Sequence, residues 1–182
     1  MAIAEAPVTP TTLPEPAAAP EAHTEPKGLA IICYSGDLEK TWAAMILAST
    51  AGAMAMPTKV FVTFWGLQTF VRDDVRITGE NWMQKMMSVM QRPGISHRKL
   101  SKMNFFGMGP WMMRKLAKRY HVASPRELLD MATLMGVEFI PCQMTMDMFG
   151  IRREDLIDGM GEPVGAATYL GYVGEGAAPL FI

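Results

Sequence analysis

The sequence predicts an α/β fold in which helices cover both faces of a mostly parallel sheet. Residues 28–34, 60–65 and 137–140 form short apolar runs of strand length, and runs that are apolar on both sides are typical of central strands packed between helices. A helical stretch separates the first two runs. Strand, helix and strand in this order form a βαβ unit, which makes its two strands parallel through a right-handed crossover.

The first strand ends in a turn that also starts a helix. Ser35, Gly36 and Asp37 follow the apolar run 28–34, and Ser35 or Asp37 is available as the N-cap. The helix is expected over about residues 38–54. Its small and apolar side chains leave almost no polar face, which predicts either deep burial or a subunit contact.

Pro57 ends that helix, and the second strand is expected at 60–65. Residues 66–72 then predict a short connecting helix or turn. The uncharged stretch 41–56 is shorter than the roughly 20 residues that span a bilayer, and Lys59 interrupts it before the next apolar run. A buried helix of a soluble domain is therefore preferred, and membrane contact is disfavoured.

The best-marked helix of the chain follows Ser124. Ser124 is its expected N-cap, Pro125 suits the first helical position, and Glu127 completes a capping box. Gly136 closes the helix, and the strand at 137–140 follows at once.

The remaining elements are shorter. A helix is expected over residues 142–149 with Gly150 as its end, and a turn with a short final strand over 153–160. A last helix is expected at 163–173, followed by a loose tail at 176–182.

Cys142 is the candidate functional residue. It comes directly after the strand 137–140 and Pro141, and in open α/β sheets ligands and chemistry gather at the carboxyl ends of strands. Free backbone N–H groups at the start of the next helix favour a thiolate over a thiol there. The alternative is a small buried residue that fills the strand end, and position alone does not separate the two interpretations.

Composition limits the possible functions without choosing one. The chain has 17 basic and 18 acidic residues, so its net charge gives no argument for nucleic acid or anionic membrane. Its two cysteines, Cys33 and Cys142, form neither a disulfide framework nor a CxxC motif. We therefore expect a reducing, cytoplasmic setting.

Residues 1–27 are rich in Ala, Pro, Thr and Glu and have no apolar periodicity. Such a segment cannot bury enough surface to offset its ordering entropy, so a disordered leader is expected. The single domain is expected over residues 28–175.

Within that domain, residues 73–122 form a helical insertion with an unusual surface. Ten Lys or Arg residues lie between positions 76 and 121 against one acid, Glu80, together with many Met and aromatic residues. The insertion could be a flap with solvated charges, an interface for another protomer or an acidic partner, or an amphipathic segment on a membrane surface. Nucleic acid is not expected, because no recognised module motif accompanies the charge.

Several separated motifs, in the same order, resemble those of the DsrE/DsrF/DsrH-like family, and in particular its Met-rich DsrE-like sulfur-carrier branch. The resemblance covers residue 28 to about residue 173. The residues that carry it are Ser35-Gly36-Asp37-Leu38-Glu39-Lys40, Phe64-Trp65-Gly66-Leu67, Cys142-Gln143-Met144-Thr145-Met146-Asp147, Gly150-Ile151 and Asp155-Leu156-Ile157-Asp158-Gly159.

The resemblance implies a flavodoxin-like three-layer sandwich, usually assembled as a homo-oligomer, that carries sulfane sulfur in the cytoplasm. A rhodanese-like or TusA-like donor would load a cysteine as a persulfide or thiosulfonate, and Cys142 matches that cysteine. This thiol chemistry needs no metal or organic cofactor. Ser35, Gly36 and Asp37 are expected to line the same edge. The N–H groups of Gln143 and Met144, together with Thr145, are expected to stabilise the anion.

Two functions of other classes compete with sulfur carriage. The first is a non-catalytic, Met-rich adaptor or membrane-associated subunit in which Cys142 is only structural. A small redox enzyme is the weaker alternative, because the sequence has no CxxC and no GxGxxG after the first strand.

Overall fold

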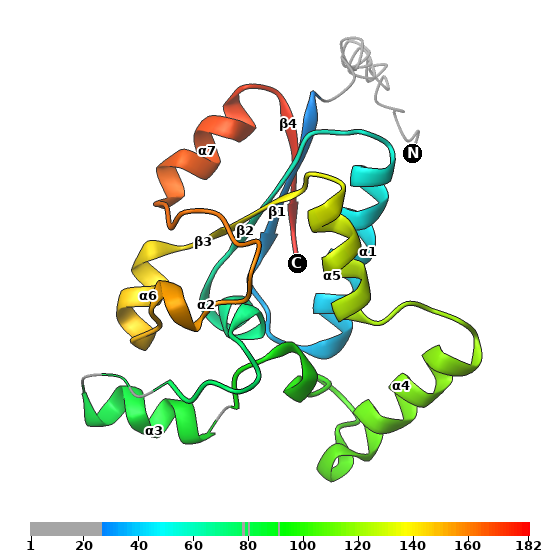
Figure 1. Cartoon of the computed structure of the whole chain (residues 1–182), viewed down its shortest axis with the longest axis vertical. Helices are drawn as coiled ribbons and strands as arrows, with labels where there is room; N and C mark the ends of the chain where they lie inside the picture. Colours follow the sequence, from blue (N-terminus) through cyan, green and yellow to red (C-terminus); the bar gives the residue numbers. More distant parts are fainter. Residues whose placement is uncertain (1–26, 78, 80, 91) are drawn as a thin grey trace, which may run out of the picture.

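The computed structural model describes residues 27–182 except 78, 80 and 91, so residues 1–26 of the expected leader lie outside the described residues. Its centre is a parallel sheet of four strands in the order β3-β2-β1-β4 (Figure 1). The strands are β1 (Gly28–Cys33), β2 (Thr58–Val62), β3 (Glu138–Pro141) and β4 (Ala177–Phe181). The prediction of an α/β fold on a parallel sheet is confirmed.

Helices cover both faces of this sheet and make three layers. Figure 1 shows α1 (Leu38–Ala53) and α5 (Pro125–Leu134) on one face and α7 (Ala166–Gly174) on the other. Successive strand residues alternate between two buried clusters, since Ile31 and Cys33 pack in one cluster while Ala30 packs with Tyr169 in the other. The Tyr169 hydroxyl donates to the Ala30 carbonyl at 3.1 Å, which ties α7 to the central strand.

Helix α5 begins as the sequence predicts. The Ser124 hydroxyl accepts from the Glu127 N–H at 3.3 Å, and the Glu127 carboxylate accepts from the Ser124 N–H at 2.7 Å. This capping box, with Pro125 at the first helical position, fixes the start of the helix that leads into β3.

The second strand is shorter than predicted. It ends at Val62, and the chain then turns into α2 (Phe64–Leu67) and the 3₁₀ turn η1 (Gln68–Phe70). The turn brings Gly66 against the end of β1, where its N–H donates to the Tyr34 carbonyl at 2.8 Å. A Cβ on Gly66 would lie 2.2 Å from the Cys33 carbonyl oxygen, so only glycine fits this approach.

The end of the chain corrects two predictions. Residues 153–160 hold the 3₁₀ turn η4 (Arg153–Asp155) and isolated bridges but no strand of their own. The expected loose tail is instead β4, which pairs along β1 from Gly28 to Ile32. Alanine and proline are rare in strands, so the sequence of β4 did not indicate a strand. Pro179 is tolerated because β4 is an edge strand.

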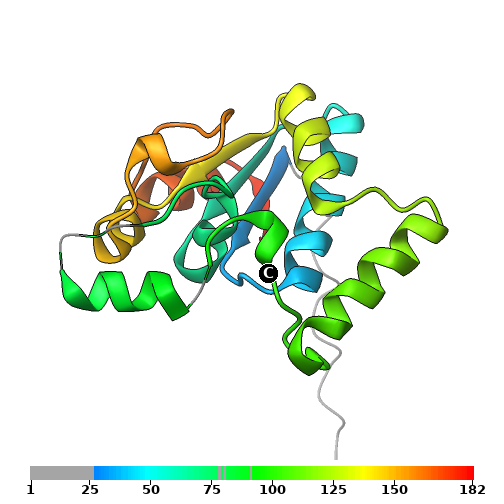
Figure 2. The ribbon, with the colours of Figure 1, turned by 60° about the horizontal axis from the view of Figure 1, so that its bottom comes forward.

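The insertion projects from the body of the molecule. It contains α3 (Trp82–Met90), two 3₁₀ turns, η2 (Ile95–His97) and η3 (Phe105–Gly107), and α4 (Met108–Arg119). Figure 2 shows α3 and α4 standing away from the sheet. A bond from the Leu38 N–H to the Lys99 carbonyl, 2.8 Å long, anchors the insertion to the start of α1.

Part of the apolar surface of the molecule faces solvent. Ile46 and Leu47 of α1 are exposed, so the helix that the sequence predicts to lack a polar face is buried along one side only. Phe106 and Trp111 of the insertion are exposed as well.

In the part of the chain that the structure describes, none of the helices is both long enough and apolar enough to cross a bilayer.

Candidate functional site

Cys142 lies at the carboxyl end of β3 and is the N-cap of α6 (Gln143–Phe149). Its N–H donates to the Val62 carbonyl at 2.9 Å, which fixes it to the end of β2. On its other side Cys142 forms an isolated parallel bridge with Val164. Two neighbouring segments therefore hold its backbone in place.

Hydrogen-bond donors surround the Cys142 sulfur. Burial raises the pKa of this thiol, but hydrogen bonds from the hydroxyl and N–H of Thr145, the hydroxyl of Thr63 and the N–H of Met144 together outweigh burial. The pKa of Cys142 consequently lies below its ordinary value. The site favours the thiolate, which is the nucleophilic form of cysteine.

The two threonines act as a pair. Their hydroxyl oxygens lie 3.0 Å apart, and the Phe64 N–H donates to the Thr145 oxygen at 3.2 Å. A hydroxyl has only one proton to donate. The two hydroxyls therefore form a short relay: when Thr63 donates to Thr145, the Thr145 proton is left for the sulfur, and in the reverse arrangement Thr63 donates to the sulfur.

Thr63 is a site residue that was not predicted, although the sequence contains a signal for it. Thr63 follows directly after the last residue of β2, as Cys142 follows directly after the last residue of β3. The register pairs Val62 with Pro141, so the next residue of each strand meets the other at the same edge. Because the ends of neighbouring parallel strands meet at one edge, the position of Thr63 directly after β2 is that signal.

The turn at Ser35, Gly36 and Asp37 follows β1 at the same edge of the sheet. The Ser35 hydroxyl donates to the Asp37 carboxylate at 3.0 Å, and that carboxylate pairs with Lys40 at 2.8 Å. A Cβ on Gly36 would lie 2.6 Å from the Trp65 carbonyl oxygen. The turn contacts α2 and Arg98 of the insertion, and the Ser35 N–H donates to the Ile182 carbonyl at 3.4 Å, just after β4; among the described residues, no hydrogen bond joins the turn to Cys142.

Gln143 and Asp147 engage each other beside the thiol. The Gln143 side-chain amide donates to the Asp147 carboxylate at 2.7 Å, and the Gln143 N–H donates to the Val164 carbonyl at 3.0 Å. Of the two N–H groups expected to stabilise the anion, that of Met144 is therefore directed at the sulfur and that of Gln143 at a carbonyl.

Cys33, the second cysteine, is in a different environment. It is fully buried in the cluster under α1 and α5, whereas Cys142 belongs to the cluster on the α7 side. Burial raises the pKa of Cys33 to about 12. Cys33 is consequently a neutral core thiol at physiological pH, and only Cys142 has an environment that favours reaction.

A sequence model of the DsrE/DsrF/DrsH-like family matches residues 25–181. The chain belongs to this family. The resemblance noted from the motifs is therefore confirmed over nearly all of the described domain.

Two relatives share more than a third of their aligned residues with this member of the DsrE/DsrF/DrsH-like family. The uncharacterized protein YrkE of Bacillus subtilis is 36% identical over 156 residues, which cover 86% of this chain and 97% of YrkE. The sulfur carrier protein DsrE2 of Allochromatium vinosum is 35% identical over 161 residues, which cover 87% of this chain and 99% of DsrE2.

Solved structures are more distant from this family member. The YchN protein of Escherichia coli aligns with a TM-score of 0.48 at 13% identity, over 85% of this chain and 99% of YchN. The protein MTH1491 of Methanobacterium thermoautotrophicum aligns with a TM-score of 0.41 at 14% identity, over the same share of each chain.

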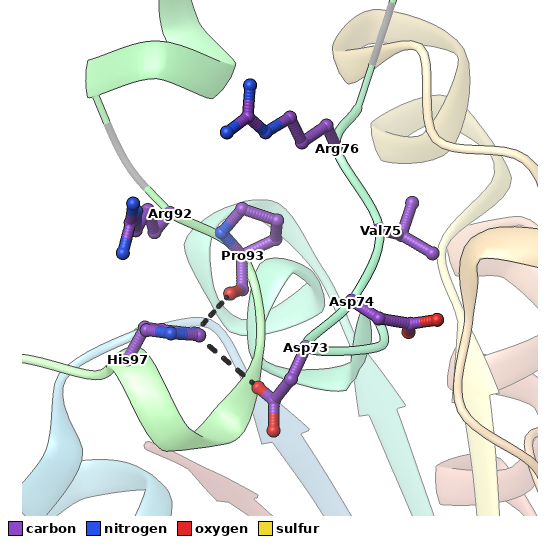
Figure 3. Close-up of a pocket in the computed structure, with 7 residues that line it drawn as sticks. All are labelled: Asp73, Asp74, Val75, Arg76, Arg92, Pro93 and His97. Atoms are coloured by element: carbon purple, nitrogen blue, oxygen red, sulfur yellow. Dashed lines mark hydrogen bonds and ion pairs between the residues drawn. The ribbon is translucent and has the colours of Figure 1, made fainter.

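Two surface cavities lie away from the thiol, in and beside the insertion. The first, of about 450 Å³, is lined by Asp73, Asp74, Val75, Arg76, Arg92, Pro93 and His97 (Figure 3). There the His97 ring contacts both the Pro93 carbonyl and the Asp73 carboxylate. Among the described residues, no group of three His, Cys, Asp or Glu side chains is placed to hold a metal ion.

The threonine relay predicts that Thr145→Val lowers the reactivity of Cys142. Valine has nearly the same shape but no proton to donate, so the pKa of Cys142 should rise by about one unit or more, the size expected for loss of a charge-assisted hydrogen bond. The measurement is the rate of alkylation of Cys142 by iodoacetamide against pH, followed by the mass of its peptide.

Thr63→Val should raise the pKa less, because Thr145 still reaches the sulfur in that variant. Thr133→Val is the control, since its hydroxyl bonds to the Leu129 carbonyl within α5. Equal alkylation profiles for Thr145→Val and Thr133→Val would contradict the relay.

Proposed function

We propose that this protein is a sulfur carrier that accepts sulfane sulfur on Cys142 and passes it to a partner protein. One observation supports the proposal above others: hydrogen bonds lower the pKa of the Cys142 thiol at a strand end. Family membership also supports the proposal, because the chain matches 99% of the length of a relative that is named as a sulfur carrier.

The transfer chemistry uses the thiolate directly. The Cys142 thiolate attacks the outer sulfur of a donor such as thiosulfate, and a new sulfur–sulfur bond forms at Sγ. The sulfur–sulfur bond of thiosulfate breaks, and sulfite leaves with the electron pair. An acceptor thiolate later attacks the outer sulfur of the Cys142 persulfide, and the Cys142 thiolate leaves.

The hydrogen-bond donors have a role in both halves of this cycle. They stabilise the attacking thiolate, and they stabilise it again when it becomes the leaving group. A lower thiol pKa makes a better leaving group, so the site favours release of sulfur as well as its capture. Cys142 is 3% exposed, which shelters the bound sulfur but requires the partner to approach closely.

Partners, assembly and compartment belong to the same proposal. A rhodanese-like or TusA-like protein is the donor that we propose, and we expect the carrier to be a homo-oligomer in the reducing cytoplasm. Neither cysteine forms a disulfide, which is compatible with a reducing compartment.

The almost complete burial of Cys142 favours one alternative function, that of an adaptor. A Met-rich adaptor would keep its cysteine as a core residue and use exposed side chains such as Met112 and Trp111 for assembly. The adaptor needs no reactive thiol, so chemistry at Cys142 separates the two functions.

The sulfur-carrier function predicts that a brief exposure of the reduced protein to polysulfide adds sulfur atoms to Cys142. Tetrathionate should add a thiosulfonate group there, with thiosulfate as the leaving group. The measurement is intact mass before and after treatment with dithiothreitol, which should remove the adduct.

Cys142→Ser should gain no mass, and Cys33→Ser should gain as much as the natural protein because Cys33 is fully buried. An adduct that forms only after denaturation would support the adaptor instead.

The basic surface of α4 is the proposed docking site for an acidic partner. Trp111, Met112 and Leu116 are exposed along this helix. The Lys115 ammonium lies 4.9 Å from the centre of the Trp111 ring. Charges beside exposed Met and aromatic side chains suit an adaptable contact that is steered by electrostatics.

Charge reversal at Lys115 and Lys118 should therefore weaken partner binding at least about tenfold and reduce its salt dependence. Arg114 is left unchanged, since its guanidinium donates to the Ser96 carbonyl. The measurement is titration calorimetry at several salt concentrations with a TusA-like protein. The control is the double variant Arg126→Glu and Arg152→Glu, which changes the net charge by the same amount. Equal weakening of partner binding by the two double variants would rule out a specific contact at α4.

A further inference from the structure

The second cavity, of about 570 Å³, lies between the 3₁₀ turns of the insertion and the start of α4. We call it the basic cavity. The residues that line it are Ser96, His97, Arg98, Lys99, Asn104, Phe106, Gly107, Pro110 and Arg114. Four of these carry cationic or titratable nitrogen groups, and none is acidic. The cavity of Figure 3 differs, because Asp73 and Asp74 line it beside its arginines.

Arg98 is the buried member of this set. It is 5% exposed, and its guanidinium donates to the Gly94 carbonyl at 3.0 Å and to the Arg92 carbonyl. Burial lowers the pKa of Arg98 to about 10, so it remains charged at neutral pH. No carboxylate of the described residues forms an ion pair with it; Asp73 and Asp37 act on it only from a greater distance.

A buried cation without a counter-ion is costly. The neighbouring cations increase this cost. Arg114 donates to the Ser96 carbonyl at 2.8 Å and to the Arg98 carbonyl at 3.3 Å. Within the described part of the chain, neither Arg114 nor Lys99 pairs with a carboxylate, although salt bridges form elsewhere on the surface. An anion bound in the cavity would offset the positive charges of Arg98, Arg114 and Lys99 together.

Backbone and amide groups add further features that suit an anion. The N-cap Gly107 and the first-turn residue Pro110 place the positive end of the twelve-residue helix α4 at the cavity. The Asn104 side-chain oxygen is buried and has no hydrogen-bond partner. Asn104 also lines the cavity, and its side-chain NH₂ group is a hydrogen-bond donor.

We propose that the basic cavity binds a tetrahedral oxyanion group, as in sulfate, thiosulfate or a phosphate. The volume exceeds that of a single ion, and Phe106, which is fully exposed to solvent, is one of the lining residues, so an oxyanion carried on a small organic molecule also fits. This site is independent of sulfur transfer: its ligand binds through charge and hydrogen bonds, and Cys142 takes no part.

The experiment is calorimetric titration of the full-length protein with sulfate, thiosulfate, phosphate and phenyl phosphate, each at the same ionic strength. Binding by inorganic and organic anions alike would indicate recognition of the oxyanion group alone. Preference for phenyl phosphate would indicate an organic ligand that uses the aromatic wall. Arg114→Gln and Lys99→Gln should each weaken binding about tenfold, as expected for loss of a charge-assisted contact.

Arg119→Gln is the matched control, since it removes the same type of charge from the same helix outside the cavity lining. It should bind like the natural protein, and Cys142→Ser should bind sulfate and phosphate, which cannot react with the thiol, like the natural protein. Arg98→Gln, checked for folding by circular dichroism, should abolish binding if it folds. An equal response to chloride, equal weakening by Arg119→Gln, or no binding at millimolar anion would overturn the proposal while leaving sulfur loading of Cys142 unaffected.

Discussion

The candidate site depends on the hydrogen bonds that reach the Cys142 sulfur. Burial alone would make this thiol resemble Cys33, whose pKa is about 12. The Thr145 hydroxyl and N–H, the Met144 N–H and the Thr63 hydroxyl reverse that effect. The two cysteines of one small domain therefore differ in chemistry, because one has donors and the other only apolar neighbours.

Parallel strand pairing creates this environment. Every strand of the described sheet ends at the same edge, and the register of Val62 with Pro141 brings the residues after β2 and β3 together. Gly66 lets the chain turn sharply after β2, which sets α2 against the end of β1. The same turn presents the Phe64 N–H to Thr145 at 3.2 Å. Backbone geometry thus orients the threonine that donates to the thiolate.

Local signals in the sequence predict part of this arrangement. The apolar runs, the capping box at Ser124 and the cysteine directly after a strand were sufficient for the fold class and for Cys142. Thr63 was missed, because it becomes a neighbour of Cys142 only through sheet register, which no local pattern contains. β4 was missed for a related reason: residues 177–181 have weak strand propensity and are held by pairing with β1.

The most direct measurement is a carbon-13 NMR titration of protein labelled at the cysteine Cβ atoms, which follows each thiol separately. The account predicts that Cys142 titrates below the pKa of an ordinary cysteine, while Cys33 stays protonated throughout the accessible range. A Cys142 resonance that titrates at or above that value would contradict the claim that its hydrogen bonds outweigh its burial.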